Sequence, residues 1–457
     1  MVRSSGCAFL LKEIKKKKGD LIMKKRFLIL FATVMIALAP NFSANAQEKI
    51  EKEIEALKDS VRQLKEKLKE QKLKASQIEE GQKLFKDELS SIVEALKGIE
   101  IGFSATGVAQ GSIGNDKNKN IPSDRERKDR VDGSISADLE ISKKIGDHGL
   151  ATVILSGAHG EGIDPRIPSW WGINGDSEGD KDVYLRELWY EHKLFDDKLV
   201  FTIGKVDLTA YFDSNAAAND ETAQFLSPGF VNSIAIEFPD DNGPGVKVQF
   251  IPMDLLDISL AWGDGDADWN ELGRRSFFIG EVGLHPKFGE LQGNYRLYSW
   301  FREHKRDDDF GVSWKDRIRG KSKSKDGWGL GLSVDQALNP NVTLFARLGY
   351  QDKKAYEFDW AWSLGGEIKG DYWGRKDDIL GAAFGMAMIS GDYKDFKRIV
   401  DAEPWFKKNE SHMEIYYRFQ LNKHISISPD LQILWNAQGN GKFDPVTVIG
   451  LRGAIEF

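Results

Sequence analysis

Charged side chains recur at alternate positions within otherwise apolar segments of this chain. These residues are Arg296, Arg347, Arg418, Arg452, Lys247, Glu414 and Asp430. Residues two apart in an extended segment lie on one face, so each of these groups belongs to a polar face. Guanidinium and carboxylate groups that face each other across water offer fixed donors and acceptors, which suits hydroxyl-rich solutes. For each Arg taken singly, the alternative is a solvated charge without solute contact.

Three aromatic residues occupy the same polar faces: Tyr298, Trp300 and Tyr416. Aromatic rings are flat apolar surfaces, and Tyr and Trp also carry a polar group at the edge. We expect these rings to offer platforms against which sugar rings can pack.

Enzyme chemistry finds little support in the sequence. The single Cys7 excludes a Cys-based metal site, and the seven His include no pair at metal-ligand helical spacing. No G-x-x-x-x-G-K-[ST] phosphate loop and no G-x-S-x-G nucleophile motif is present. We therefore expect no enzyme activity, no cofactor and no metal; an outer-membrane hydrolase is the enzyme alternative.

Strands are the elements that must position these groups. In the segment 425–435, Ile425, Ile427, Leu431 and Ile433 share one face, and Ser426, Ser428, Asp430 and Gln432 share the other. Such alternation is typical of a sheet with one apolar and one polar face. A soluble sandwich turns the apolar face inward, whereas a membrane barrel turns it toward lipid and lines a wet lumen with the polar face.

The whole sequence favours the barrel over the sandwich. Mean hydropathy is −0.43, and the longest apolar run, 27–39, is too short for a spanning helix. The chain closes on an alternating strand that ends at Phe457. We predict an all-β transmembrane barrel of about 16 antiparallel strands over residues 99–457, preceded by an α-helical coiled coil. The strands are expected at 99–114, 132–145, 149–158, 182–195, 198–208, 244–253, 255–263, 275–286, 289–302, 327–338, 341–350, 359–369, 376–390, 411–422, 424–436 and 445–457.

The longest connection between the expected strands runs from about residue 209 to 243. It contains the apolar pairs Phe225-Leu226 and Phe230-Val231. A loop of this length in a compact architecture usually has a function, and its apolar pairs need a surface to pack on. We expect it to fold into the lumen and narrow it; an extracellular flap is the alternative.

Residues 1–46 are predicted to be a signal peptide. Met23-Lys24-Lys25-Arg26 is basic, 27–39 is apolar, and Ala44-Asn45-Ala46 fits a cleavage site. Residues 1–22 precede a better start and are interpreted as a start-site extension. Residues 1–46 hold nine Lys or Arg and two Asp or Glu, which leaves 55 basic against 69 acidic residues. This acidic exported chain is not expected to bind nucleic acid.

Residues 47–98 are predicted to form a coiled coil. Between Ile50 and Ile99, 13 of 15 positions at alternating spacings of four and three are apolar. That 3.5-residue period keeps one seam facing a partner helix along a supercoil. Self-association is expected; one long helix folded back on the next domain is the alternative.

Several motifs resemble the carbohydrate-selective porin (OprB-type) family. They are 204–215 (GKVDLTAYFDSN), 219–222 (NDET), 224–226 (QFL), 373–378 (WGRKDD), 414–420 (EIYYRFQ), 425–434 (ISISPDLQIL) and 446–457. The resemblance implies a 16-stranded outer-membrane porin, usually trimeric, that passes sugars by diffusion. It also implies that Lys205, Asp207, Asp213 and Asn215 lie where a strand enters the constriction loop.

The resulting hypothesis is an outer-membrane porin for small hydrophilic solutes, with carbohydrates favoured. The expected pore-lining residues are Lys205, Asp207, Asp213, Asn215, Arg296, Arg347, Glu414, Arg418, Asp430 and Arg452. The expected partners are sugars, outer-membrane lipid, further copies in a homotrimer held by barrel and coiled coil, and cell wall contacted by a periplasmic coiled coil. The alternatives are a general or ion-preferring porin, and an envelope tether that uses the coiled coil.

Overall fold

The computed structural model describes residues 23–26, 29–30, 44–121, 126–304, 313–321 and 325–457 of the chain. Within these residues the chain divides into two compact units, which meet between Lys97 and Gly98. Most of the predicted signal peptide, 1–46, lies outside the described residues, as does the whole extension 1–22.

The first unit contains one long helix, α2 (Ala44–Leu96), of 53 residues. Ile54, Val61 and Ala75 of the predicted seam are buried, whereas Phe85 and Leu89 are exposed. The helix confirms the secondary structure expected for 47–98. No helix among the described residues is both long and apolar enough to cross a membrane.

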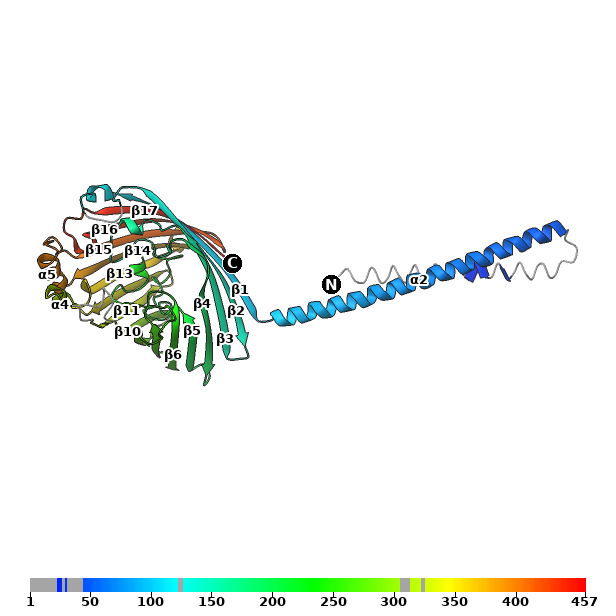
Figure 1. Ribbon diagram of the computed structural model, residues 1–457, viewed down its shortest axis with the longest axis horizontal. Helices are drawn as coiled ribbons and strands as arrows, with labels where there is room; N and C mark the ends of the chain where they lie inside the picture. The colour runs from blue at the N-terminus through cyan, green and yellow to red at the C-terminus, as the bar shows by residue number, and fades with distance from the viewer. Residues whose placement is uncertain (1–22, 27–28, 31–43, 122–125, 305–312, 322–324) are drawn as a thin grey trace. The chain divides into compact units, whose positions relative to one another are not determined.

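The second unit is a single sheet whose strands follow one another along the chain (Figure 1). Its strands are β1 (Ile99–Ile113), β2 (Val131–Ile145), β3 (Gly149–His159), β4 (Lys181–Leu194), β5 (Leu199–Val206), β6 (Gly243–Met253), β7 (Leu256–Asp264), β8 (Ser276–Leu284), β9 (Lys287–Phe288), β10 (Leu291–Arg302), β11 (Gly327–Asn339), β12 (Val342–Gln351), β13 (Phe358–Gly370), β14 (Arg375–Ile389), β15 (Glu410–Asn422), β16 (Ile425–Trp435) and β17 (Val446–Glu456). The short helices are α3 (Pro228–Val231), α4 (Trp314–Ile318), α5 (Gly391–Ile399), and the 3₁₀ turns η1 (Asn115–Asn118), η2 (Asp164–Arg166), η4 (Asp371–Trp373) and η5 (Ala437–Gly439).

The sheet closes on itself, because β1 pairs antiparallel with both β2 and β17. At the seam, Gly107 lies opposite Ile135 on one side and Gly453 on the other. The two-residue β9 and the longer β8 both pair with β10, so they form one interrupted strand. Over the described residues this makes a closed antiparallel barrel of 16 strands, as the sequence predicts.

Short and long connections alternate around the barrel. The link between β4 and β5 is a tight turn in which Phe195, Asp196 and Asp197 all have positive φ. Similarly short links join β6 to β7 and β11 to β12, and they lie at one rim. Long loops such as 160–180, 207–242 and 390–409 lie at the other rim. There α4 and α5 pack together, and the Trp314 and Tyr393 rings are 4.8 Å apart (Figure 1).

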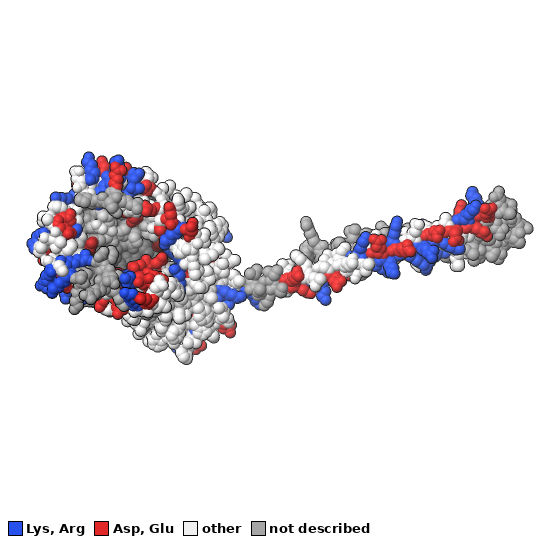
Figure 2. All heavy atoms as spheres, in the orientation of Figure 1, with Lys and Arg blue, Asp and Glu red and all other residues white. Residues whose placement is uncertain are grey.

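The burial pattern is inverted relative to a soluble protein. On β16, Ser428 and Gln432 are 1% exposed, whereas Ile427 is 37% exposed; on β17, Arg452 is 2% and Leu451 52% exposed. Cross-strand neighbours share a face, so this inversion runs around the whole ring. Figure 2 shows charged side chains gathered at the loop end of the barrel, at the left, and few on the wall to its right. The apolar faces therefore form the outer wall and the polar faces line the interior, which excludes the sandwich.

Two long loops fold into the barrel and carry its apolar core. We call residues 207–242, between β5 and β6, the inserted loop, and residues 160–180 the β3–β4 loop. Phe225 and Phe230 of the inserted loop pack on Trp171 of the β3–β4 loop and on the inward rings of Phe345 and Tyr416. The inserted loop therefore lies in the lumen, and the alternative of an extracellular flap is wrong.

Candidate functional site in the barrel interior

Arg347 of β12 holds the inserted loop. Its Nε lies 3.0 Å from Asp213 Oδ2. Its Nη atoms donate to four backbone carbonyls, those of Phe230 (2.6 Å), Ala218 (2.7 Å), Asp213 (2.9 Å) and Val231 (2.9 Å). The side chains of Arg347 and Asp213 are 2% and 0% exposed. Arg347 thus fixes the inserted loop to the barrel wall and is not open to solutes.

Asp213 is the acidic partner of Arg347 in this ion pair. Its left-handed φ of 56° turns the chain at the loop entrance, and its Oδ2 accepts from the Ser233 N–H at 2.6 Å. Complete burial raises the pKa of Asp213, and the Arg347 guanidinium and the Ser233 N–H oppose that rise. The two ends of the loop are therefore tied at one carboxylate.

Glu414 of β15 holds the middle of the same loop. Its carboxylate accepts from the backbone N–H groups of Leu226 (2.5 Å) and Ser227 (3.0 Å), and the residue is fully buried. These two N–H groups lie just before and at the N-cap of α3. A carboxylate placed there satisfies donors that have no partner within the short helix.

Arg452 and Arg418 hold the segment just before it. Arg452 donates to the carbonyls of Glu221 (2.5 Å) and Gln224 (2.9 Å), and Arg418 donates to that of Ala223 (3.3 Å). Three predicted Arg residues thus bind loop backbone. Sequence reasoning found their inward direction but assigned them to solutes.

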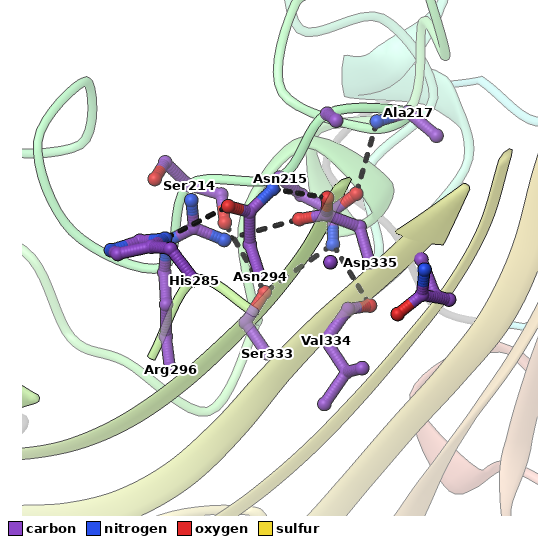
Figure 3. A network of polar contacts seen from close by, with 12 residues as sticks. Ser214, Asn215, Ala217, His285, Asn294, Arg296, Ser333, Val334 and Asp335 are labelled. Atoms are coloured by element: carbon purple, nitrogen blue, oxygen red, sulfur yellow. Dashed lines mark hydrogen bonds and ion pairs between the residues drawn. The ribbon is translucent and has the colours of Figure 1, made fainter. Parts of the chain in front are cut away.

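Asn215 joins the loop to the wall at β11 (Figure 3). Its Nδ2 donates to Ser333 Oγ (3.4 Å) and to the Val334 carbonyl (3.3 Å). Beside it Arg296 pairs with Asp335 at 3.1 Å, and that ion pair joins β10 to β11. The structure therefore brings Asn215 and Arg296 into one polar network.

Asp207 and Asp430 lie apart from that network. Asp207 Oδ1 accepts from the backbone N–H (2.8 Å) and Oγ1 (2.6 Å) of Thr209, which fixes the turn into the loop. Asp430 accepts from Gln432 Nε2 at 2.9 Å. The same Gln432 atom donates to the Ile173 carbonyl of the β3–β4 loop, also at 2.9 Å.

Lys205 does not belong to the interior. It lies opposite Leu188 of β4, which is 48% exposed on the outer wall, and paired residues share a face. Beside it, Gly204 has φ 148°, and a Cβ there would lie 2.1 Å from the Leu188 carbonyl oxygen. The expectation that Lys205 lines the pore is wrong, because the register of β5 turns it outward.

The inward aromatics are also covered. Tyr298, Trp300 and Tyr416 are 1–2% exposed. Trp300 Nε1 donates to the Ala235 carbonyl at 2.9 Å, and Tyr416 packs edge-on against Phe225 with ring centroids 5.1 Å apart. These three side chains pack against the inserted loop. They are therefore not open to stack on sugar rings, contrary to the expectation.

The β3–β4 loop is a second plug that sequence reasoning missed. Trp171 is 2% exposed, and a Cβ on Gly385 of β14 would lie 2.2 Å from its ring. Glu410 accepts from Ser169 Oγ (2.6 Å) and from the Trp170 N–H (3.0 Å). The sequence did hold a signal for this loop. Two adjacent Trp in a polar segment need a surface to pack on, just as the apolar pairs of the inserted loop do.

A pocket of about 420 Å³ lies above the inserted loop, at the long-loop rim. Four segments line it with Trp170, Ile234, Ile236, Glu237, His304, Trp314, Arg317, Gln351, Ala355, Tyr356, Glu357 and Phe358. We call it the vestibule pocket. It combines flat rings with fixed polar groups, and no sequence signal could have gathered residues so far apart in the chain.

The polar wall of the vestibule pocket is centred on Glu237. His304 Nε2 lies 3.0 Å from Glu237 Oε1, Arg302 Nη1 lies 3.6 Å from it, and the Tyr356 hydroxyl bonds the other oxygen. Burial alone would raise the pKa of Glu237, but His304 and Arg302 bring it below its usual range. Burial opposes protonation of His304, but the Glu237 carboxylate raises the His304 pKa. The charged forms of Glu237 and His304 therefore stabilise each other in this wall.

Comparison with known proteins matches the fold and its motifs. Residues 85–457 match the family described as "Carbohydrate-selective porin, OprB family". An uncharacterized protein of Aquifex aeolicus is 24% identical over 231 residues, which are 50% of this chain and 58% of that protein. Porin B of Pseudomonas aeruginosa is 26% identical over 200 residues, which are 38% of this chain and 43% of that protein. The chain thus spans about half the length of these curated relatives.

Solved structures share the architecture. The high-pH structure of Pseudomonas putida OprB has a TM-score of 0.67 at 17% identity, over 81% of this chain and 97% of that one. The low-pH structure of the same protein has a TM-score of 0.50 at 15% identity. At these identities the likeness establishes the barrel fold alone.

Proposed function

This chain belongs to the OprB family of carbohydrate-selective porins, and we propose that its barrel is an outer-membrane channel for the passive diffusion of small carbohydrates. The observation that carries the proposal is the inverted barrel, with an apolar outer wall and a polar interior narrowed by two tethered loops. A water-filled path with fixed donors and acceptors admits small hydroxylated solutes.

We propose that the vestibule pocket holds a sugar ring before it passes the inserted loop. Its volume lies within the range of small-molecule sites, about 300–1,000 Å³. The rings of Trp170, Trp314 and Phe358 can pack against the C–H face of a pyranose. Glu237 can accept and the Arg317 guanidinium in the same lining can donate, so hydroxyl groups at the edge of the sugar would find both kinds of partner.

The rim that carries short turns would face the periplasm, and the long loops would face outward. β1 begins beside the end of β2 at the short-turn rim, since Ile99 lies opposite Lys143. With that orientation the chain would enter the barrel from the periplasmic side, which supports a periplasmic location for α2. An exposed stretch of its seam, with Ile78, Phe85 and Leu89, supports self-association as a trimer, and the helix could also contact the cell wall.

The test is sugar flux through the full chain after signal removal. Liposomes that contain the protein should swell in glucose and in larger sugars at rates that fall faster than size alone predicts. Glucose should also reduce ion conductance in planar bilayers in a saturable way. A Trp314→Ala variant should keep the conductance and need more glucose for the same reduction, with Trp373→Ala, at the other rim, as the matched control. If swelling follows solute size alone and glucose leaves the conductance unchanged, the chain is a general porin.

The tether alternative has its own test. Deletion of 48–97 should leave conductance intact in a channel. If deletion instead detaches the outer membrane from the cell wall while solute uptake is unchanged, the helix is the working part.

A further inference from the structure

Three carboxylates meet at the end of β7 and in the loop that follows it, at the long-loop rim. Asp264, Asp266 and Asp268 alternate with Gly265 and Ala267. One oxygen from each of the three lies within 4.8 Å of the others. Ca²⁺ binds oxygens at about 2.3–2.6 Å, so two ligands on opposite sides of one ion lie at most about 5 Å apart. The spacing therefore suits a single ion between the three side chains.

Asp264 is the group that points to a ligand. The residue is 1% exposed, and neither of its carboxylate oxygens has a hydrogen-bond donor among the described residues. A buried carboxylate without donors is strongly disfavoured, and an adjacent cation removes that penalty.

The neighbouring cation in the chain does not meet this need. Arg275 Nη1 lies 3.0 Å from Asp266 Oδ2, and so neutralises the second carboxylate rather than the buried one. Asp266 Oδ1 also has no donor among the described residues. The ion pair of Arg275 thus involves Asp266, and both oxygens of Asp264 stay without a hydrogen-bond donor among the described residues.

We propose that Asp264, Asp266 and Asp268 bind one Ca²⁺ at the outer rim of the barrel. All three ligands are carboxylate oxygens, which hard cations prefer, whereas Zn²⁺ and Cu²⁺ favour His and Cys. Asp268 is exposed, so water can complete the 6–8 ligands that Ca²⁺ takes. Mg²⁺ demands a stricter octahedron than a loop with this exposure imposes.

The site is built on backbone that also holds the inserted loop. The Gly265 carbonyl, between two of the ligands, accepts from the Asp240 N–H (2.9 Å) and from Arg302 Nη2 (3.0 Å). Arg302 also donates to the Phe238 carbonyl at 2.6 Å. An ion at Asp264 and Asp266 would therefore order the segment where the inserted loop leaves the lumen.

Terbium luminescence is the direct test, because two Trp are built into the segment. Trp262 lies two residues before Asp264, and Trp269 follows Asp268. The full chain is folded into detergent from inclusion bodies, so that no lipopolysaccharide carries Ca²⁺ into the assay. Tb³⁺ excited through Trp should give a saturable signal that Ca²⁺ displaces. Titration calorimetry should count one Ca²⁺ per chain, with a dissociation constant of about 0.1–1 mM, as in extracellular sites.

Asp264→Asn and Asp268→Asn should each weaken Ca²⁺ binding about tenfold or more, because affinity follows the number of ligand charges. Asp395→Asn on α5, an exposed carboxylate paired with Arg398, is the matched control and should bind as the parent does. Heat-modifiable migration on gels checks that each barrel is folded; if Asp264→Asn does not fold, the exposed Asp268→Asn decides. The proposal fails if no saturable binding occurs up to about 10 mM Ca²⁺, or if binding is unchanged in the folded variants. Neither result depends on whether the channel passes sugars.

Discussion

Replacing Arg347 by Ala should release the inserted loop while the barrel stays closed. The side chain makes four hydrogen bonds to loop carbonyls and an ion pair with Asp213, and both partners of the pair are buried. Removing one partner of a buried pair costs about 3–5 kcal/mol, since it leaves the other charge uncompensated. Exposure of the pair is 2% and 0%, so solvent screening does not reduce this figure.

The expected consequence is a large shift in the loop's equilibrium. At about 1.4 kcal/mol for each factor of ten, the ratio of docked to released loop should fall by about two to three and a half powers of ten. The ladder of strand hydrogen bonds does not involve the Arg347 side chain, so folding into the barrel should persist. Single-channel recording should therefore show a larger and noisier conductance, and limited proteolysis should cut within 207–242.

Two controls separate this reasoning from general damage. Arg375→Ala removes a half-exposed Arg that pairs with Asp378 beyond the lumen, and should leave the conductance unchanged. The double variant Arg347→Ala, Asp213→Asn removes the stranded charge and should recover part of the loop's protection. If Arg347→Ala conducts like the parent and its loop resists protease, the loop is held elsewhere and the reasoning is refuted.

Three further predictions follow from the pocket and the helix. Trp314→Ala removes one ring worth about 1 kcal/mol of stacking, so the glucose concentration that halves the conductance should rise about fivefold in bilayer recordings, and an unchanged value would remove Trp314 from the sugar site. The Glu237–His304 contact should stabilise the vestibule pocket only within a pH window. Glu237 has a lowered pKa, so its contribution is present above its ordinary value of 4.5 and is lost as pH falls through the lower folded value. His304 has a raised pKa, so its contribution is present below 6.5 and is lost as pH rises through the higher folded value. Protection of 313–321 from hydrogen exchange, taken relative to the intrinsic rate at each pH, should therefore be greatest between these limits. His304→Gln should abolish the loss of protection at alkaline pH; a loss that survives would contradict the assignment. Phe85→Glu should weaken self-association of the full chain in sedimentation, whereas Lys86→Glu, one residue off the seam, should not; equal effects would show that the seam is not the contact.

Alternation in the sequence was sufficient to predict the strands and their two faces, as β16 illustrates. Ser428 and Gln432 are inward and Ile427 outward because a strand has a period of two, and no tertiary information is needed to read that period. The alternation also correctly predicted that Arg347, Glu414 and Arg452 point to the interior. The place of the inserted loop followed as well, since Phe225 and Phe230 could not remain in water.

The sequence could not decide what those inward groups touch. Arg347 and Tyr298 appear open along a strand, but the inserted loop covers both. Lys205 was misplaced because its role came from a motif, whereas the pairing with Leu188 sets its face.

The amino-acid sequence by itself therefore determined a closed barrel with a polar interior, its strand boundaries within a few residues, and a loop folded inside. Only the tertiary structure decided that the predicted Arg residues are loop anchors, that a second loop fills the lumen, and that four distant segments form the vestibule pocket. The physical reason is the distance along the chain over which each feature is set. Periodicity is a property of neighbours along the chain, whereas contact between loops depends on the curvature and register of the complete ring.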